Sequence, residues 1–123
     1  MSKRVLDVGN CVPDHSALRR LIEGNFDATV ERAHVWQDAA AHLAKEKFDL
    51  VLINRKLDRD YSDGLDVLRQ IKGDPAYADT PVMLITNYPE SQQQAVEAGA
   101  ELGFGKLEFS KAETKEKLQK FLG

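Results

Sequence analysis

Five short apolar segments alternate with longer segments of helical periodicity along the chain, and this alternation limits the folds that it can adopt. Between the apolar segments, and after the last of them, apolar residues recur every three or four positions, as they do in amphipathic helices. Strands that alternate with helices form a parallel sheet covered by helices on both faces. We therefore expect one α/β domain over residues 1–123, built from five β/α units with strands near residues 4–8, 28–33, 49–54, 81–86 and 102–105.

The expected helices begin and end at residues that favour helix termini. Pro13 opens the first helix, Asp63 can cap the third through its side chain, and Gly73 ends that helix. The second and fourth helices are expected over residues 37–46 and 90–98. The apolar stripes expected to face the sheet are Ala17, Leu18, Leu21 and Ile22 in the first helix, Ala40, Leu43 and Ala44 in the second, Leu65, Leu68 and Ile71 in the third, and Thr114, Leu118, Phe121 and Leu122 in the last.

Composition excludes several classes of protein. An apolar share of 42%, a charged share of 30% and a net charge of −3 are ordinary for a globular domain and favour neither nucleic acid nor an anionic membrane as partner. The longest apolar run is far shorter than the ~20 residues that span a bilayer, and residues 1–4 lead into a strand rather than a secretory signal. The single cysteine, Cys11, cannot form an internal disulfide. We expect a cytoplasmic protein.

Polar or small residues follow the carboxyl ends of four predicted strands. Gly9 and Asn10 follow the first strand, Asn54 closes the third, Thr86 closes the fourth, and Lys106 follows the fifth. In open doubly wound sheets, ligands bind at this edge, outside the carboxyl ends of the strands. We therefore expect these side chains to share one shallow cleft.

Several segments resemble the receiver domains of bacterial response regulators. Each is a weak signal alone, but together they match a receiver in order and spacing over nearly the whole chain. The resemblance implies a flavodoxin-like, doubly wound (βα)5 fold with a five-stranded parallel sheet in the order 2-1-3-4-5. The segments are residues 48–53 before Asn54, residues 63–68 at the start of the third helix, residues 81–86, residues 97–100 and Lys106.

The resemblance also assigns roles to the strand-end residues. In active receivers, an acidic pair after the first strand holds Mg²⁺, an aspartate ending the third strand accepts a phosphoryl group, and a hydroxyl and a lysine contact the phosphoryl oxygens. Here Gly9 and Asn10 stand at the acidic pair, Asn54 at the phosphoacceptor, and Thr86 and Lys106 at the hydroxyl and the lysine. All three carboxylates are replaced, so we expect Mg²⁺ binding to be weak or absent, and we expect no enzymatic activity.

Other departures concern the charge of the cleft and the fifth strand. Without a carboxylate partner, Lys106 should leave the cleft positive, more so if Arg55 or Lys56 turns inward. The position of the switching aromatic residue of active receivers is Gly103, and the proline that usually follows the lysine is Leu107. These two departures argue against the aromatic switch of active receivers.

Two residues within predicted elements have less obvious roles. Asp7 lies inside a strand that should be buried, so either it meets a cation or a backbone amide, or the edge of this strand is wet. Trp36 stands near the start of the second helix and is expected to be a packing residue.

Neither of two possible metal-binding sets has a recognised ligand pattern. Asp58, Asp60 and Asp63 lack the regular spacing and the terminal glutamate of a calcium hand, and Asp63 is better explained as a helix cap. The histidines, which are His15, His34 and His42, are dispersed along the chain, which argues against a zinc site.

The preferred function is that of a pseudo-receiver, a phosphorylation-independent protein-interaction module in two-component signalling. Its expected partner is a histidine kinase or another signalling protein. The expected contact surface is formed by the fourth helix, the fifth strand and the fifth helix, which includes residues 90–98 and 111–123. Both segments are rich in charged and amide side chains, and the same surface could form a weak homodimer.

Two alternatives remain open. One is a small-anion sensor that uses Asn10, Asn54, Thr86 and Lys106, although no glycine-rich phosphate loop supports a nucleotide. The other is a phosphoacceptor that uses an unconventional carboxylate, and the candidates are Asp7, Asp14 and Asp58.

Overall fold

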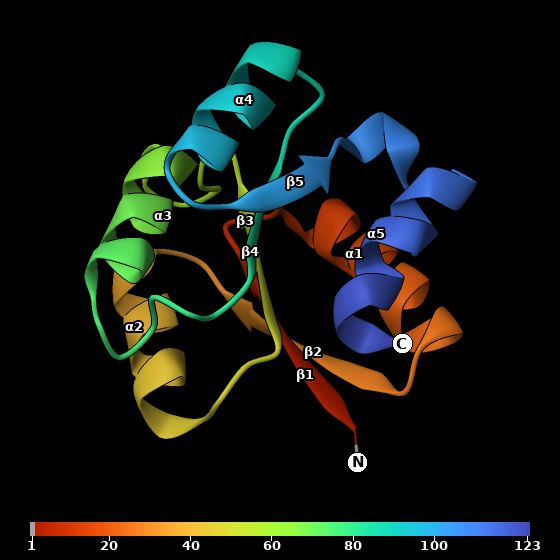
Figure 1. Cartoon of the computed structure of the whole chain (residues 1–123), viewed down its shortest axis with the longest axis horizontal. Coiled ribbons are helices and arrows are strands. Elements are labelled where there is room, and N and C mark those ends of the chain that lie inside the picture. Colours follow the sequence, from red (N-terminus) through yellow and green to blue (C-terminus); the bar gives the residue numbers. More distant parts are fainter. Residues whose placement is uncertain (1) are drawn as a thin grey trace.

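The computed structural model describes residues 2–123, in which five parallel strands alternate with five α-helices (Figure 1). The sheet has the order β2-β1-β3-β4-β5, and every neighbouring pair is parallel. The predicted (βα)5 fold and strand order are confirmed. The strands are β1 (Lys3–Val8), β2 (Ala28–Ala33), β3 (Leu50–Asn54), β4 (Val82–Ile85) and β5 (Glu101–Phe104). The helices are α1 (Val12–Asn25), α2 (Trp36–Lys45), α3 (Gly64–Gly73), α4 (Pro89–Glu97), α5 (Ala112–Leu122) and the short 3₁₀ helix η1 (Lys106–Glu108).

Two layers of helices cover the sheet, with α1 and α5 on one face and α2, α3 and α4 on the other (Figure 1). The strand β3 shows why the central strands are apolar throughout. Leu50 and Leu52 belong to the core beneath α1 and α5, whereas Val51 and Ile53 belong to the core beneath α2 and α3. All four side chains are fully buried because successive residues of a strand point to opposite faces and both faces are covered.

The predicted helices are present, but the stripe predicted for the second one is right for Leu43 and wrong for Ala40 and Ala44. Ala39 and Leu43 are the buried residues of α2, whereas Ala40 is half-buried and Ala44 is exposed. The two residues of α2 that face the core, Ala39 and Leu43, are four positions apart. The prediction placed the first of them at Ala40, one position too late. Trp36, the first residue of α2, is partly buried against the same core, in agreement with a packing role. The short helix η1 was not predicted.

The third helix begins as its sequence predicts. Asp63 is its N-cap, and its Oδ1 accepts a hydrogen bond from the backbone N–H of Leu65 at 2.9 Å. This bond satisfies one of the free N–H groups at a helix N-terminus.

The helices within residues 2–123 include none that is both long enough and apolar enough to cross a membrane.

Candidate functional site

Asn54 is held at the end of β3 by two backbone carbonyls. Its Nδ2 donates to the carbonyl oxygen of Gly9 at 3.2 Å and to that of Lys56 at 2.6 Å. The carboxyl ends of β1 and β3 are neighbours in the parallel sheet, which places Gly9 beside Asn54. Both N–H groups of the amide are therefore in use, and its orientation is set by the backbone on either side.

Gly9 is itself constrained at this position. It has a φ of +78°, in the left-handed region, and a Cβ there would lie 2.5 Å from Cγ of Leu57. Its carbonyl oxygen also accepts the backbone N–H of Asp58 at 3.0 Å. Glycine is thus required both by the backbone conformation and by the close approach of the loop after β3.

Asn10, the next residue, is directed toward Asp7 rather than toward Asn54. It is fully buried, and its Nδ2 donates to Oδ1 of Asp7. Its own Oδ1 has no hydrogen-bond partner among residues 2–123. Of the five residues predicted at this edge, only Gly9 and Asn54 are joined to each other by a hydrogen bond within that range.

Lys106 forms a salt bridge that its sequence context did not suggest. Its Nζ lies 2.7 Å from Oδ2 of Asp14, so the prediction that this lysine lacks a carboxylate partner is wrong. The helix α1 begins soon after β1 ends, and its first turn therefore lies at the same edge of the sheet and carries Asp14 there. The thiol of Cys11 donates to the same oxygen at 3.1 Å.

The salt bridge changes the acidity of Asp14. Partial burial alone would raise the pKa of this carboxyl, but the hydrogen bonds from Lys106 and Cys11 and the charge of Lys106 outweigh burial and lower the pKa below its usual value. Asp14 is therefore a carboxylate at neutral pH, and it offsets the charge of Lys106.

The other two cations predicted for the cleft are engaged elsewhere. Arg55 donates from Nη1 to Oδ1 of Asp63 at 2.7 Å and from Nε to Oγ of Ser91 at 3.2 Å. Lys56 lies over the ring of Tyr61, with 5.4 Å between Nζ and the ring centroid. The cleft is therefore less positive than predicted, because carboxylates offset the charges of Arg55 and Lys106 while Lys56 contacts only an aromatic ring.

Thr86 is buried at the end of β4. Its Oγ1 accepts the backbone N–H of Tyr88 at 3.2 Å, and its own backbone N–H donates to the carbonyl of Phe104 at 3.1 Å. The hydroxyl thus helps to form the turn that leads into α4.

Asp7 and His15 form a buried pair beneath the start of α1. Asp7 is fully buried, and its Oδ2 lies 2.7 Å from Nδ1 of His15. The prediction of a wet strand edge is wrong, and the partners are an imidazole and the side-chain amide of Asn10 rather than a backbone amide. Burial raises the pKa of Asp7, and the hydrogen bonds from Asn10 and His15 offset this effect only in part.

The raised pKa of Asp7 predicts how stability depends on pH. In the folded protein this pKa lies above the ordinary value of 3.8, so the stability linked to the carboxyl is fully present below that value and is lost as the pH rises through the folded pKa. Asp7→Asn cannot ionise. We expect its free energy of unfolding, relative to the wild type, to increase as the pH rises from about 3 to about 5.5, below the range in which free histidine titrates.

Urea unfolding of both proteins at several pH values measures this difference. Asp60→Asn is a control of opposite sign, because hydrogen bonds from Ser62 lower the pKa of the exposed Asp60. The stability linked to Asp60 is present above its unfolded pKa and is lost as the pH falls. If the difference in the free energy of unfolding between Asp7→Asn and the wild type does not vary with pH, the pKa of Asp7 is not raised in the folded protein.

The other acidic and imidazole groups do not gather at one point. Asp58 lies 3.6 Å from both Arg32 and His34, whereas His42 faces Glu31 at 3.9 Å. Asp60 and Asp63 serve the turn at Ser62 and the cap of α3. Within residues 2–123, no group of three or more His, Cys, Asp or Glu side chains is arranged to hold a metal ion.

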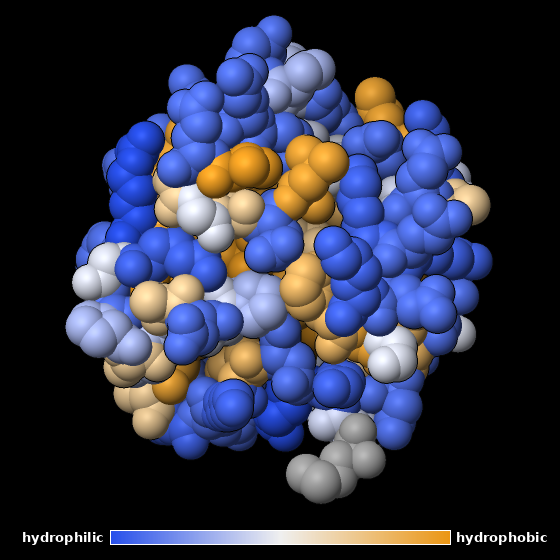
Figure 2. Space-filling model, in the orientation of Figure 1, coloured by the Kyte–Doolittle hydropathy of each residue, from blue (hydrophilic) through white to orange (hydrophobic). Residues whose placement is uncertain are grey.

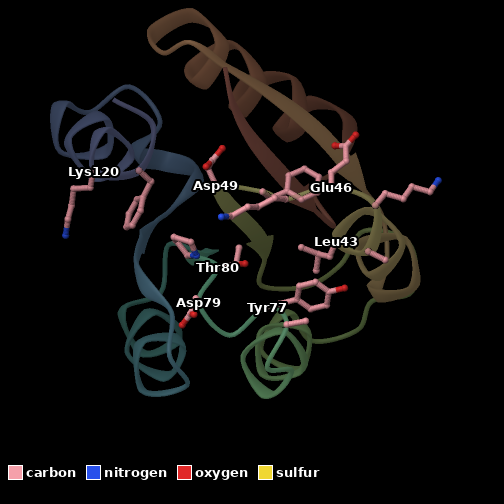
Figure 3. A pocket seen from close by; sticks show the side chains of 14 residues that line it. Leu43, Glu46, Asp49, Tyr77, Asp79, Thr80 and Lys120 are labelled. Carbon is pink, nitrogen blue, oxygen red and sulfur yellow. The ribbon is translucent and has the colours of Figure 1, made fainter. Parts of the chain in front are cut away.

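A cavity of about 750 Å³ lies at the opposite edge of the sheet, where β3 and β4 begin. Tyr77 and Leu43 lie close together on one side of it, and Lys120 lies across from them (Figure 3). Acidic and basic side chains balance around the opening, so its charge favours neither a cation nor an anion. They are Glu46, Asp49 and Asp79 against Lys45, Lys47 and Lys120.

The surface formed by α4, β5 and α5, here called the α4–β5–α5 surface, is less polar than its sequence suggested. Hydrophobic side chains gather along the boundary between α4 and β5 (Figure 2). Val96 is 44% exposed, Leu102 is 54% exposed, and Leu107 at the nearby η1 is 80% exposed. Leu102 and Leu107 line a groove of about 550 Å³, and Lys111 and Lys117 also line it. Apolar groups between charged ones are typical of a protein contact surface.

Sequence reasoning missed the partners of two site residues. A signal for the first was present, because Asp14 stands in the first turn of a helix that follows a strand directly, and that turn lies at the strand-end edge. No local signal pairs Asp7 with His15, because their contact depends on how α1 lies against β1.

Comparisons with known proteins agree with this architecture. A family profile described as "Response regulator receiver domain" matches residues 11–120. Among solved structures, the chemotaxis protein CheY4 of Vibrio cholerae is 21% identical with a TM-score of 0.79, and the alignment covers 99% of this chain and 100% of that one. The signal receiver domain of a DNA binding response regulator protein (merR) from Colwellia psychrerythraea 34H is 23% identical with a TM-score of 0.83, and 97% of each chain is covered.

A response regulator receiver protein from Pseudomonas putida is 16% identical with a TM-score of 0.78, and 98% of each chain is covered. At these identities, the solved structures show a shared fold. The family profile goes further, since it matches most of the length of the chain. The chain therefore belongs to the response regulator receiver domain family of two-component signalling.

Proposed function

We propose that this receiver domain is a phosphorylation-independent protein-interaction module and not an enzyme. One observation carries the proposal. The side chain at the end of β3, where active receivers place their phosphoacceptor aspartate, is the amide of Asn54, whose nitrogen is bound to the carbonyls of Gly9 and Lys56. An amide has no anionic oxygen with which to attack phosphorus.

The surrounding groups also fit Mg²⁺ poorly. This ion takes oxygen ligands in octahedral geometry and is usually held through one or two carboxylates. The nearby carboxylates already have partners, because Asp7 binds Asn10 and His15, and Asp14 binds Lys106. Gly9 offers no side chain at all. We therefore infer that the edge of the sheet does not assemble a magnesium site.

The α4–β5–α5 surface is the best candidate for the contact with a partner. It combines exposed apolar side chains, Leu102 and Leu107 among them, with the lysines of the adjacent groove. We propose that it binds a histidine kinase or another signalling protein, and that it supports a weak homodimer. Leu102→Ser would then weaken partner binding, and the core would be unaffected because this side chain is more than half exposed.

The test is an amide-resolved NMR titration with Mg²⁺ and then with beryllofluoride, which mimics a phosphoryl group. We expect the amides of Asn54, Thr86 and Lys106 to show no saturable shift, because neither a metal site nor an anionic acceptor is assembled there. Saturable shifts at these amides that spread into β5 and α5 would overturn the proposal.

A second candidate is favoured by the salt bridge of Asp14. A receiver that has lost its acceptor aspartate could use another carboxylate near the lysine, and Oδ2 of Asp14 lies 2.7 Å from Nζ of Lys106. A carboxylate oxygen would then attack the phosphorus of an acyl phosphate, and the bond from phosphorus to the donor's carboxylate would break. Asp7 and Asp58 are weaker candidates, because Asp7 is fully buried and Asp58 lies beside Arg32 and His34 rather than beside Lys106.

Incubation with acetyl phosphate and Mg²⁺, followed by intact mass measurement, tests this candidate. A gain of one phosphoryl group that disappears in Asp14→Asn and persists in Asp60→Asn would establish it. The absence of any gain would leave the interaction module as the conclusion. A small-anion sensor is less favoured than either, since an anion at Lys106 would have to displace Asp14.

A further inference from the structure

The pairing of β4 with β5 contains an irregularity. Met83 pairs with Glu101 and Ile85 pairs with Phe104, so one residue of β4 lies opposite two residues of β5. The two are Leu102 and Gly103, and the single residue is Leu84. Such a bulge interrupts the ladder of backbone hydrogen bonds, and a buried backbone group without a partner is unfavourable.

The side chain of Gln92, from α4, occupies this interruption. Its Nε2 donates to the carbonyl oxygen of Leu84 at 2.9 Å and to that of Thr86 at 3.2 Å. Its Oε1 accepts the backbone N–H of Gly103 at 3.0 Å. A carboxamide has the same donor and acceptor groups as a peptide bond. Gln92 therefore joins α4 to backbone groups on both sides of the bulge.

Glycine at position 103 makes this arrangement possible. A Cβ there would lie 2.3 Å from the carbonyl oxygen of Leu84 and 3.2 Å from Oε1 of Gln92. Any side chain would thus push β5 away from β4 or push the amide out of the bulge. Gln92 is 9% exposed although it belongs to a polar helix.

Burial of apolar side chains contributes little to holding α4 on the sheet. Three residues of this helix are buried, and they are Ser91, Gln92 and Ala95. Ala95 is small, and Ser91 is bonded to Arg55. Because a helix with little buried apolar surface opens easily, the three hydrogen bonds of Gln92 are a large part of what fixes α4.

We propose that Gln92 is a latch that holds α4 on the bulge between β4 and β5, so that the α4–β5–α5 surface keeps one conformation whatever the state of the strand-end cleft. The inference rests on the proposed function, because a permanently formed surface matters only if a partner binds it without phosphorylation. The test therefore measures the opening of α4 itself rather than partner binding or phosphorylation.

Native-state hydrogen exchange of Gln92→Met measures how much the hydrogen bonds of Gln92 slow the opening of α4. Methionine keeps the length and packing of the side chain but removes all three hydrogen bonds. We expect the amides of α4 and of Gly103 to exchange roughly tenfold faster than in the wild type, or more, because buried backbone groups lose their partners. Gln94→Met is the matched control, since Gln94 is exposed on the same helix and should leave exchange unchanged.

Amides of β3 distinguish local opening from a general loss of stability. If amide exchange in Gln92→Met is faster in α4 but unchanged in β3, the latch is supported. If α4 exchanges equally in Gln92→Met and Gln94→Met, the latch is refuted. Should Gln92→Met not fold, Gln92→Glu gives the same decision, because its carboxylate still accepts from Gly103 but cannot donate to Leu84 or Thr86. Saturable binding of beryllofluoride would overturn the proposed function without changing these exchange rates in the unliganded protein.

Discussion

Gly64→Ala is expected to lower the free energy of unfolding by about 3 kcal/mol or more, as severe overpacking does. Gly64 is the first residue of α3, and a Cβ at this position would lie 2.1 Å from the carbonyl oxygen of Asn54 and 3.0 Å from Cγ2 of Ile53. The nearer atom belongs to the backbone of the central strand and cannot move aside. The whole N-terminus of α3 would have to shift away from the strand end that carries Asn54.

Gly73→Ala is the matched control at the other end of the same helix. A Cβ at Gly73 would meet no atom within 4 Å. Alanine favours a helix over glycine by up to about 1 kcal/mol, so this variant should be as stable as the wild type or slightly more stable. Urea unfolding followed by circular dichroism measures both. Equal midpoints for the two variants would mean that α3 does not approach β3 as closely as described.

Asn54→Asp is expected to destabilise the fold by about 2 kcal/mol at neutral pH, even though it restores the residue type of an active receiver. The Nδ2 of Asn54 donates to two carbonyl oxygens, those of Gly9 and Lys56. A carboxylate oxygen in its place would face both carbonyl oxygens without a proton to donate to either. The loss should diminish as the pH falls, because a protonated carboxyl can donate one of these bonds.

Asn87→Asp controls for the change of amide to acid at the same edge of the sheet. The Oδ1 of Asn87 accepts the backbone N–H of Leu107 at 3.1 Å, and its side chain is exposed. An aspartate keeps this bond, so we expect a change within about 0.5 kcal/mol, as at most surface positions. If chemical denaturation finds Asn54→Asp as stable as Asn87→Asp at neutral pH, the nitrogen of Asn54 does not face those carbonyls.

The acidic pair cannot be restored as simply as the acceptor. Gly9→Asp would place a side chain on a backbone with φ of +78° and bring its Cβ within 2.5 Å of Cγ of Leu57. The path of the loop after β3 therefore prevents a carboxylate at position 9. The departure of this chain from active receivers is built into its backbone as well as into its side chains.

Most of the fold could be predicted from the sequence, because local periodicity states which residues are buried. The run that forms β3 is apolar at every position up to Asn54, and only a strand covered on both faces buries such a run. The cap of α3 was equally clear, since Asp63 acts on an N–H two residues away. The apolar face of α2 was predicted wrongly because alanine is small and occurs on both buried and exposed faces of a helix. Ala39, Ala40 and Ala44 differ in burial but not in chemistry.

The sequence by itself determined the alternation of strands and helices, the strand-end positions and the absence of a carboxylate from the end of β3, whereas the strand order came from its resemblance to receiver domains. Only the tertiary structure decided which charged and amide groups meet. Asp14 reaches Lys106 because α1 begins at the edge where β5 ends, and Gln92 reaches Gly103 because one extra residue in β5 opens the ladder beside α4. Burial follows from short-range periodicity, whereas polar partners depend on how elements far apart in the chain are placed in space.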